Sequence, residues 1–566
     1  MSSKHHDKII RKRVGEMPLL HTMAQRLGLR DMLTRYIKPH GNEKFPAADT
    51  LLLLIFNIAS GRQPLYELDE WIGKLDDRVL GSDAPLPQGA FNDDRFARAL
   101  DKLFQVDRAA MITDIALQVI RATALDVNEV HNDSTSVKTC GNMPGESATG
   151  LLFRHGHSKD HRPDLKQIIY NLTISADGAV PIHYKTYPGN RNDDTTHIET
   201  WEVLRKIVGK PDFLYVADCK VCTHKQLAHI VACGGKVITL MPNAWLEATL
   251  FKEKLRRQKT KTKIIILRLP CAKSDVGYDS FYRFSGHHST LKGDYTLHWI
   301  YSTEKRKRDR YAREQSLLKV EHDLAGLIGK LNTRKLKTRE QIMRSVEDIL
   351  QKRNANRFYH IDVQTVKEMH KVQLGKGRPS RKTQYKTIYK FLYTLSWTRN
   401  RKTLEQEKRV DGIFPILCTD PLLSAKQALT AYKYQPRLEK RFSQFKSVHH
   451  AAPTLFKKVE RVEAMMCLFF MALILQAVIE REVRLKMQNE DIDAIPIYPE
   501  HRRACHPTTT KIFDRFYDTS IYKLVEGNRT IKMFKDDLSA VQTQVLGLMG
   551  MTEESYWRFT GWRPHT

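Results

Sequence analysis

The sequence predicts an α/β protein, in which a mixed β-sheet with helical crossovers follows an all-helical N-terminal domain and is interrupted by an inserted domain. Residues 1 to about 125 carry apolar residues at three- and four-residue spacing, which is typical of packed helices. From about 126 strand-like segments alternate with helical ones. At 566 residues and 41% apolar content, we expect two to four domains.

The N-terminal part, 1–125, contains the helical patterns "LLHTMAQRLGL", "TLLLLIFNIAS" and "RFARALDKLFQVDRAAMITDIALQVIRATAL". Gly28 lies where a helix would stop, and Asp31 lies where the next helix would be capped. Two interpretations stay open, a DNA-binding helix-turn-helix and two ordinary packed helices, because that geometry has no strict sequence signature. We assign 1–125 as a helical DNA-binding domain.

Residues 126–244 are predicted to form the first part of the sheet. Three strand patterns, "DVNEVHNDSTSV", "QIIYNLTIS" and "AVPIHYKTY", come first, with Asp177-Gly178 as a tight hairpin signal between the last two. A helix, a strand ending at "YVAD", a second helix and the strand "KVITLM" follow. This order predicts a mixed sheet in which the first and fourth strands can be neighbours.

The rest of the chain divides into three parts. Residues 245–425 are predicted to be an inserted domain with strand-like pieces, a charged helical stretch at about 304–355 and a basic aromatic segment. Residues 426–490 are predicted to be helical and to return to the core, and 491–566 form a mixed C-terminal region. The apolar run "AMMCLFFMALILQAVIE" is under the roughly 20 residues of a membrane span and contains Gln476, so we expect a buried core helix.

Charge and cysteine content limit the partners. The 93 lysines and arginines exceed the 64 acids by 29, and aromatic residues interleave the most basic stretch, which favours nucleic acid over a small acidic ligand or a membrane. Eight cysteines in so long a chain imply no disulfide framework, so we expect a reducing cytoplasm.

Three acids form a candidate metal site. Asp133 lies in the first predicted strand and Asp218 ends the fourth, so neighbouring strands would place both carboxylates near one edge. Glu439 lies in the helical segment "AYKYQPRLEKRFSQFK", where Tyr432, Phe442 and Lys446 share about the same helical face. Oxygen ligands of this kind suit Mg²⁺ or Mn²⁺, and two such ions about 4 Å apart can stabilise both the attacking and the leaving oxygen of a phosphodiester.

The segments "HNDSTSV", "GHSKDHRPDLKQIIYNLTISADGAVPIHYKTYPGNRND", "FLYVADCKV", "DGIFPILCTD" and "YKYQPRLEKRFSQFKS" together resemble the DDE transposases of bacterial insertion sequences. The resemblance runs from about 126 to 480 and is greatest to members with a domain inserted in a ribonuclease-H-like core. It implies a catalytic, metal-binding triad of Asp133, Asp218 and Glu439, with cleavage at the element ends and strand transfer into target DNA. The family's Tyr-Arg-Glu-Lys signature has Gln435 at its arginine position, with Arg437 nearby.

The resemblance also implies a set of partners and contacts. Double-stranded DNA would be bound at the terminal repeats and at the target, by a dimer when two ends are synapsed, in the nucleoid of a bacterial cytoplasm and without a membrane. Tyr432 is expected either to stack on a displaced base or to pack in the core. The expected DNA-binding residues are Tyr432, Arg437, Lys440, Arg441, Lys446, Lys159, Arg162 and Lys166.

Three other hypotheses start from features of the same sequence. Zinc bound by histidines 155, 157 and 161 with Cys219 and Cys222 is disfavoured, because no second Cys-x-x-Cys completes a structural site. A non-catalytic DNA-binding protein derived from a transposase and a metal-dependent nuclease without strand transfer both stay open.

Overall fold

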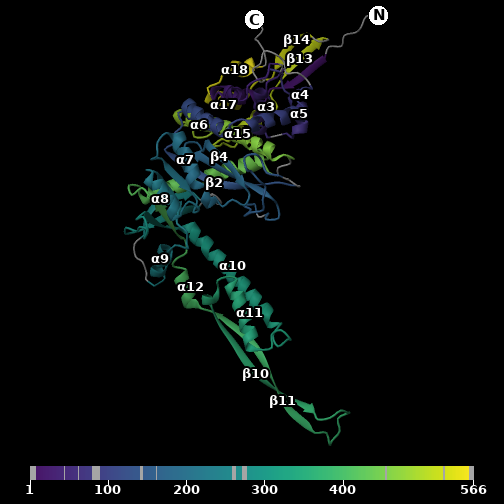
Figure 1. Cartoon of the computed structure of the whole chain (residues 1–566), viewed down its shortest axis with the longest axis vertical. Coiled ribbons are helices and arrows are strands. Elements are labelled where there is room, and N and C mark those ends of the chain that lie inside the picture. The colour runs from purple at the N-terminus through teal and green to yellow at the C-terminus, as the bar shows by residue number, and fades with distance from the viewer. Residues whose placement is uncertain are drawn as a thin grey trace. The chain divides into compact units, whose positions relative to one another are not determined.

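The chain folds into two units in this computed structural model (Figure 1). Unit 1 is discontinuous in sequence and combines Met1–Thr239 with Ala428–Thr566, whereas unit 2 is the continuous segment Leu240–Gln427. The structure describes residues 8–41, 43, 45–61, 63–78, 89–140, 145–160, 162–257, 263–270, 277–452, 456–526 and 529–559.

A mixed sheet forms the centre of unit 1. Its strands lie in the order β4-β3-β2-β5-β6. β2 pairs antiparallel with β3 and parallel with β5, so the expected neighbourhood of the first and fourth strands is confirmed. The bounds are β2 (Glu129–Lys138), β3 (Gln167–Ser175), β4 (Pro181–Pro188), β5 (Leu214–Ala217) and β6 (Lys236–Leu240).

Local sequence explains how these strands are connected. The antiparallel strands β3 and β4 are joined by a tight turn at Asp177-Gly178, as predicted, and Gly178 has φ +77°, a value that favours glycine. Parallel strands need longer crossovers, and two helices with apolar residues at helical spacing supply them. These are α7 (His197–Val208), between β4 and β5, and α8 (His224–Ala232), between β5 and β6.

The N-terminal part is mostly helical, with Gly28 at φ +62° between α1 and α2, as expected for a helix stop. Gly28 is also the N-cap residue of α2, and Asp31 lies inside the first turn rather than at the cap. The helices are α1 (Met17–Arg26), α2 (Leu29–Tyr36), α3 (Ala47–Ala59), α4 (Leu68–Lys74), α5 (Asp93–Gln105) and α6 (Arg108–Thr123), with a 3₁₀ turn at Leu65–Glu67.

The expectation of an all-helical N-terminal domain is wrong at β1 (Lys8–Arg13). This strand runs antiparallel to β13 (Ser520–Glu526), which pairs in turn with β14 (Arg529–Lys535). The segment "KIIRKR" is too short and too charged for strand alternation to show, and its partner is far away in the sequence. The first and last parts of the chain therefore share one small sheet.

The predicted core helix is α15 (Val459–Asn489), which packs against α3, α5 and β4. It is long and apolar enough to cross a membrane by length and composition, but 94% of its most apolar window is buried inside the protein. The prediction of a buried core helix is thus confirmed. Three shorter helices follow, α16 (Thr509–Phe516), α17 (Ala540–Leu548) and α18 (Glu553–Arg558).

The segment that carries Glu439 is a broken helix rather than one continuous face. α13 (Ala425–Tyr432) ends before a turn at 433–435, and α14 (Pro436–Ser443) then passes into a π-helical turn, Gln444–Val448. Pro436 at the first position of α14 is compatible with a helix start, because proline lacks the N–H that is unpaired there. The predicted shared face of Tyr432, Glu439 and Lys446 is corrected accordingly.

Unit 2 combines an antiparallel sheet, in the order β12-β9-β8-β7, with helices and a long hairpin. The charged helical stretch expected at about 304–355 is confirmed as α10 and α11, whose apolar faces form a core with Leu317, Val320, Ile342 and Val346. The elements are α9 (Leu246–Arg257), β7 (Lys263–Pro270), β8 (Tyr278–Phe284), β9 (Thr296–Ser302), α10 (Thr303–Ile328), α11 (Arg339–Gln351), β10 (Tyr359–Gln373), β11 (Tyr385–Arg399), α12 (Arg401–Glu407) and β12 (Ile413–Cys418).

Candidate active site

Asp133 lies on β2, among buried residues on either side. Its side chain is 24% exposed, and its Oδ1 accepts hydrogen bonds from the Ser134 backbone N–H at 2.7 Å and from Lys159 Nζ at 3.2 Å. Burial raises the pKa of Asp133, and the negative charge of Asp218 adds to this, whereas Lys159 acts in the opposite direction. The site therefore concentrates negative charge where water solvates it poorly.

Asp218 follows β5 directly, and the strand register places it beside Asp133. Asn132 pairs with Ala217 in the parallel ladder, so the next residue on each strand is an aspartate. Asp218 Oδ1 accepts from the Lys220 backbone N–H at 2.9 Å, and its carbonyl accepts from Thr239 Oγ1 at 2.6 Å. One carboxylate oxygen thus stabilises the turn after the strand.

Glu439 is exposed in the first turn of α14, and Gln435 attaches the start of that helix to β2. The buried Gln435 side chain donates from Nε2 to the Asn132 carbonyl at 3.0 Å, and its Oε1 lies 3.0 Å from His131 Nδ1. Sequence reasoning noted Gln435 only as a departure from a phosphate-binding arginine. The structure shows that Gln435 holds the start of α14 at Asn132, the residue directly before Asp133 on β2.

Tyr432 is half-buried near all three acids. Its pKa is raised, first by burial and then by the negative charges of Asp218, Cys219, Asp133 and Glu439. The packing alternative for Tyr432 agrees with its burial.

The remaining predicted cations differ in their surroundings. Lys159 contacts Asp133 and also donates to the Ser134 carbonyl, and Lys446 pairs with Asp160 at 2.6 Å. Arg162 pairs with Asp164 at 2.7 Å on the surface. Lys440 is exposed, whereas Arg437 and Lys166 are half-buried.

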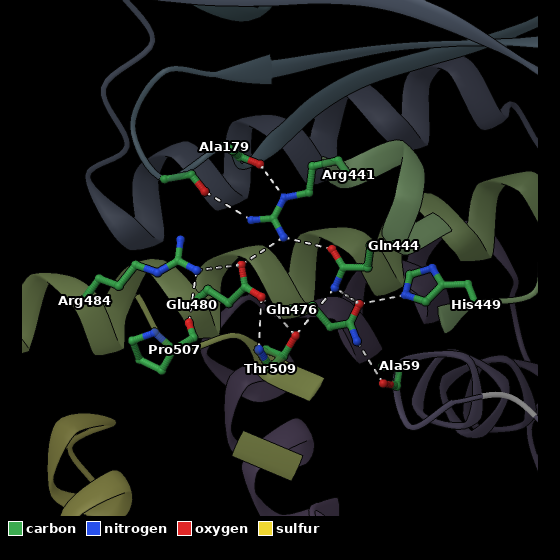
Figure 2. Close-up of polar contacts among 11 residues, drawn as sticks. Ala59, Ala179, Arg441, Gln444, His449, Gln476, Glu480, Arg484, Pro507 and Thr509 are labelled. Atoms are coloured by element: carbon green, nitrogen blue, oxygen red, sulfur yellow. Dashed lines mark hydrogen bonds and ion pairs between the residues drawn. The ribbon is translucent and has the colours of Figure 1, made fainter. Parts of the chain in front are cut away.

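Arg441 is buried, which corrects its predicted role in DNA binding (Figure 2). Its guanidinium donates to the Ala179 carbonyl at 3.0 Å, the Gly178 carbonyl at 3.2 Å, Gln444 Oε1 at 2.9 Å and Glu480 Oε2 at 3.0 Å. A side chain held by four acceptors at 6% exposure does not reach a DNA backbone. Helical spacing alone did not distinguish it from the exposed Lys440.

The network around Arg441 continues along α15 (Figure 2). Glu480 also accepts from Arg484 Nη2 at 3.3 Å and from the Thr509 backbone N–H at 3.0 Å. Gln476 accepts from Gln444 Nε2 at 2.7 Å and donates to the Ala59 carbonyl at 2.9 Å. These contacts fix α14, and with it Glu439, to the core helix. The polar residues inside the apolar run of α15 were the available sequence signal.

Asp133, Asp218 and Glu439 have metal-ligand chemistry, but in the part of the chain that the structure describes their ligand atoms do not all lie within 4.8 Å of one another. The carboxylates of Asp133, Asp218 and Glu439 are hard oxygen donors, which suit Mg²⁺ or Mn²⁺. A separate group of Glu202, His229 and Cys233 places its ligand atoms within 4.8 Å of one another, although Glu202 also pairs with Arg205 at 2.8 Å. It does not include Cys219 or Cys222, and His161 of the disfavoured zinc hypothesis lies outside the described residues.

Comparisons with known proteins place few limits on this site. A family profile described as "Domain of unknown function (DUF4277)" matches residues 9–117, which is less than half of the chain. No curated protein matches the sequence. Among solved structures, a piggyBac transposase synaptic complex with hairpin DNA, determined by cryo-EM, is similar with a TM-score of 0.36 and 8% identity, over 88% of this chain and 79% of that chain. A TM-score this low carries no argument on fold or function.

Proposed function

We propose that this protein is a DDE-type DNA transposase of the bacterial insertion-sequence class, which cleaves DNA at element ends and joins those ends to target DNA. One observation carries the proposal. Asp133 and Asp218 each directly follow a member of the last pair, Asn132 and Ala217, of two parallel strands. Gln435 attaches the helix with Glu439 to the first of these strands.

The strand order supports the same proposal. Three antiparallel strands followed by two parallel ones, in the order β4-β3-β2-β5-β6, agree with the ribonuclease-H-like core that the sequence resemblance implies. Unit 2 enters the chain between Asp218 and Glu439, where that resemblance expects an inserted domain.

The three carboxylates have the oxygen-donor chemistry of a divalent cation site. Burial, together with repulsion from the charge of Asp218, raises the pKa of Asp133. A bound cation would relieve this unfavourable negative charge. Asp133, Asp218 and Glu439 would hold Mg²⁺ or Mn²⁺, two ions in the expected case. When bound, such ions activate a hydroxyl nucleophile and stabilise charge at a phosphodiester.

The residues of the chain have separate roles in this proposal. Lys159 neutralises part of the charge on Asp133, and the Lys220 backbone N–H orients the Asp218 carboxylate. The exposed Lys440 would contact phosphates of double-stranded DNA, with a contribution that falls as salt rises. A dimer at synapsis and a location in the bacterial nucleoid belong to the same proposal.

The test is cleavage of a labelled duplex that carries the element's ends, with Mg²⁺ or Mn²⁺. We expect metal-dependent nicking that is lost in Asp218→Asn and in Glu439→Gln while DNA binding remains. Asp212→Asn is the matched control, because this exposed aspartate lies just before β5, at its opposite end. Equal nicking by Asp218→Asn and Asp212→Asn would overturn the assigned site.

Product analysis separates the alternatives. Joining of the cut ends to a second duplex indicates a transposase, whereas hydrolysis without joining indicates a nuclease. DNA binding without any metal-dependent cleavage would instead favour a non-catalytic protein.

A further inference from the structure

Unit 2 contains a two-stranded antiparallel ribbon of 15-residue strands, β10 and β11, which Figure 1 shows extending past α11. At its base, Val363 pairs with Leu395, and both are buried in the core formed with α10 and α11. We call residues 366–392, beyond this base, the outer ribbon. Its strands remain paired out to Gln373 and Tyr385.

One face of the outer ribbon is aromatic and exposed. The register places Lys367 opposite Phe391 and Met369 opposite Tyr389, on the same face as Val363 at the base. Phe391 is 58% exposed, Met369 61% and Tyr389 50%. Exposed apolar side chains on a long, unpaired ribbon are an aggregation hazard unless a partner covers them.

The charge of the outer ribbon indicates the chemistry of that partner. It contains eight lysines and arginines and a single acid, Glu368, so its net charge is +7. None of the eight cations forms an ion pair with a described residue, and Lys367 Nζ lies 3.7 Å above the Tyr389 ring. A second copy of the ribbon would bring +7 against +7, which disfavours self-association.

We propose that the outer ribbon binds duplex DNA by lying in a groove, with the face of Lys367, Lys371, Tyr389 and Phe391 toward the DNA. The major groove of DNA admits a two-stranded ribbon, and phosphates line both of its walls. The outer ribbon has cations on both of its faces, because Lys390 lies on the face opposite to that of Lys367 and Lys371. Lys367 and Lys371 are four residues apart, about 13 Å along a strand, so they reach separate phosphates. The choice of DNA as the polyanion rests on the proposed function.

The test measures DNA affinity of the full-length protein in EDTA, where metal-dependent cleavage does not occur. Fluorescence anisotropy with a labelled 40-base-pair duplex is read at several KCl concentrations. For Lys367→Ala/Lys371→Ala we expect weaker binding and a salt dependence of log K that is shallower by about 1.8. For Tyr389→Ala/Phe391→Ala we expect roughly tenfold weaker binding with an unchanged salt slope, because apolar surface buried in the groove is lost but no phosphate contact is.

The matched control is Lys335→Ala/Lys337→Ala, which removes two exposed lysines of unit 2 that lie between α10 and α11. If both ribbon variants bind DNA as tightly as this control, the proposal is wrong. If Tyr389→Ala/Phe391→Ala instead converts a dimer into a monomer at unchanged DNA affinity, the ribbon is an interface between copies and the proposal is likewise overturned.

Failure of the proposed function has a different signature. If wild-type protein shows no metal-dependent cleavage, yet the ribbon variants still lose DNA affinity, the assigned chemistry falls and the ribbon proposal stands. If cleavage occurs and needs Asp218, but the ribbon variants bind DNA normally, the assigned chemistry stands and the ribbon proposal is wrong.

Discussion

Replacing Arg441 with Met removes the buried cation that lies 3.0 Å from Glu480, at similar side-chain length. Both side chains are 6% exposed, and removal of one partner from a buried ion pair costs about 3–5 kcal/mol. Glu480 keeps the Thr509 N–H and Arg484, which favours the lower end of that range. Two backbone carbonyls of the β3–β4 turn also lose a donor, at about 1 kcal/mol each. We expect the free energy of unfolding of unit 1 to fall by about 5 kcal/mol.

The assay is a urea titration followed by hydrogen exchange in α14 and α15, which reports on unit 1 separately from unit 2. Lys440→Met is the matched control, because it removes the adjacent, exposed cation and is expected to change stability by no more than about 0.5 kcal/mol. A loss below about 1 kcal/mol in Arg441→Met would refute the inference that this network fixes α14 to the core. If Arg441→Met has normal stability but binds DNA more weakly, the result would instead support the predicted DNA contact of Arg441.

Three further predictions follow from other parts of unit 1. Gly178→Ala should lower the free energy of unfolding by about 1–3 kcal/mol, because φ is +77° and a Cβ would lie 2.8 Å from carbons of Arg481; urea denaturation that matches wild type would contradict this. Gln435→Ala should slow single-turnover DNA cleavage more than it weakens DNA binding, since it detaches the start of α14 from β2, and an equal loss of both would argue against a positioning role. Burial lowers the pKa of His21 to about 4, so the unfolded chain takes up a proton at this histidine before the folded protein does as pH falls. The free energy of unfolding should therefore be constant above about pH 6.5 and fall by about 3 kcal/mol toward pH 4. His21→Leu should flatten the measured curve of stability against pH in that window.

The central sheet was predictable because its strands are bounded by strong local signals. The buried run of β3, the Asp177-Gly178 turn and the alternation of strands with α7 and α8 determine the order, and that order brings Asp133 beside Asp218. Glu439 was predictable as a helical acid, but the break at 433–435 was not, because the turn is stabilised by contacts of Gln435 with a distant strand.

Features that depend on distant partners were missed. Arg441 and Lys440 are neighbours of like charge, and only the packing of α14 on α15 decides which of them is buried. β1 is a short basic segment whose partner is a C-terminal strand, and the charges of the outer ribbon obscure the alternation of its strands. Local periodicity does not contain this information.

The pairing of β1 with β13 has a consequence for biosynthesis. Arg13 pairs with Ser520, so β1 leaves the ribosome 520 − 13 = 507 residues before its partner. At roughly 5–20 residues per second this is a wait of about 25–100 s, during which the strand has an open edge. Unit 2 is continuous in sequence and can fold during that interval, whereas unit 1 closes only near the end of translation. Nascent chains that stop before β13 would therefore expose unit 1 to aggregation or proteolysis.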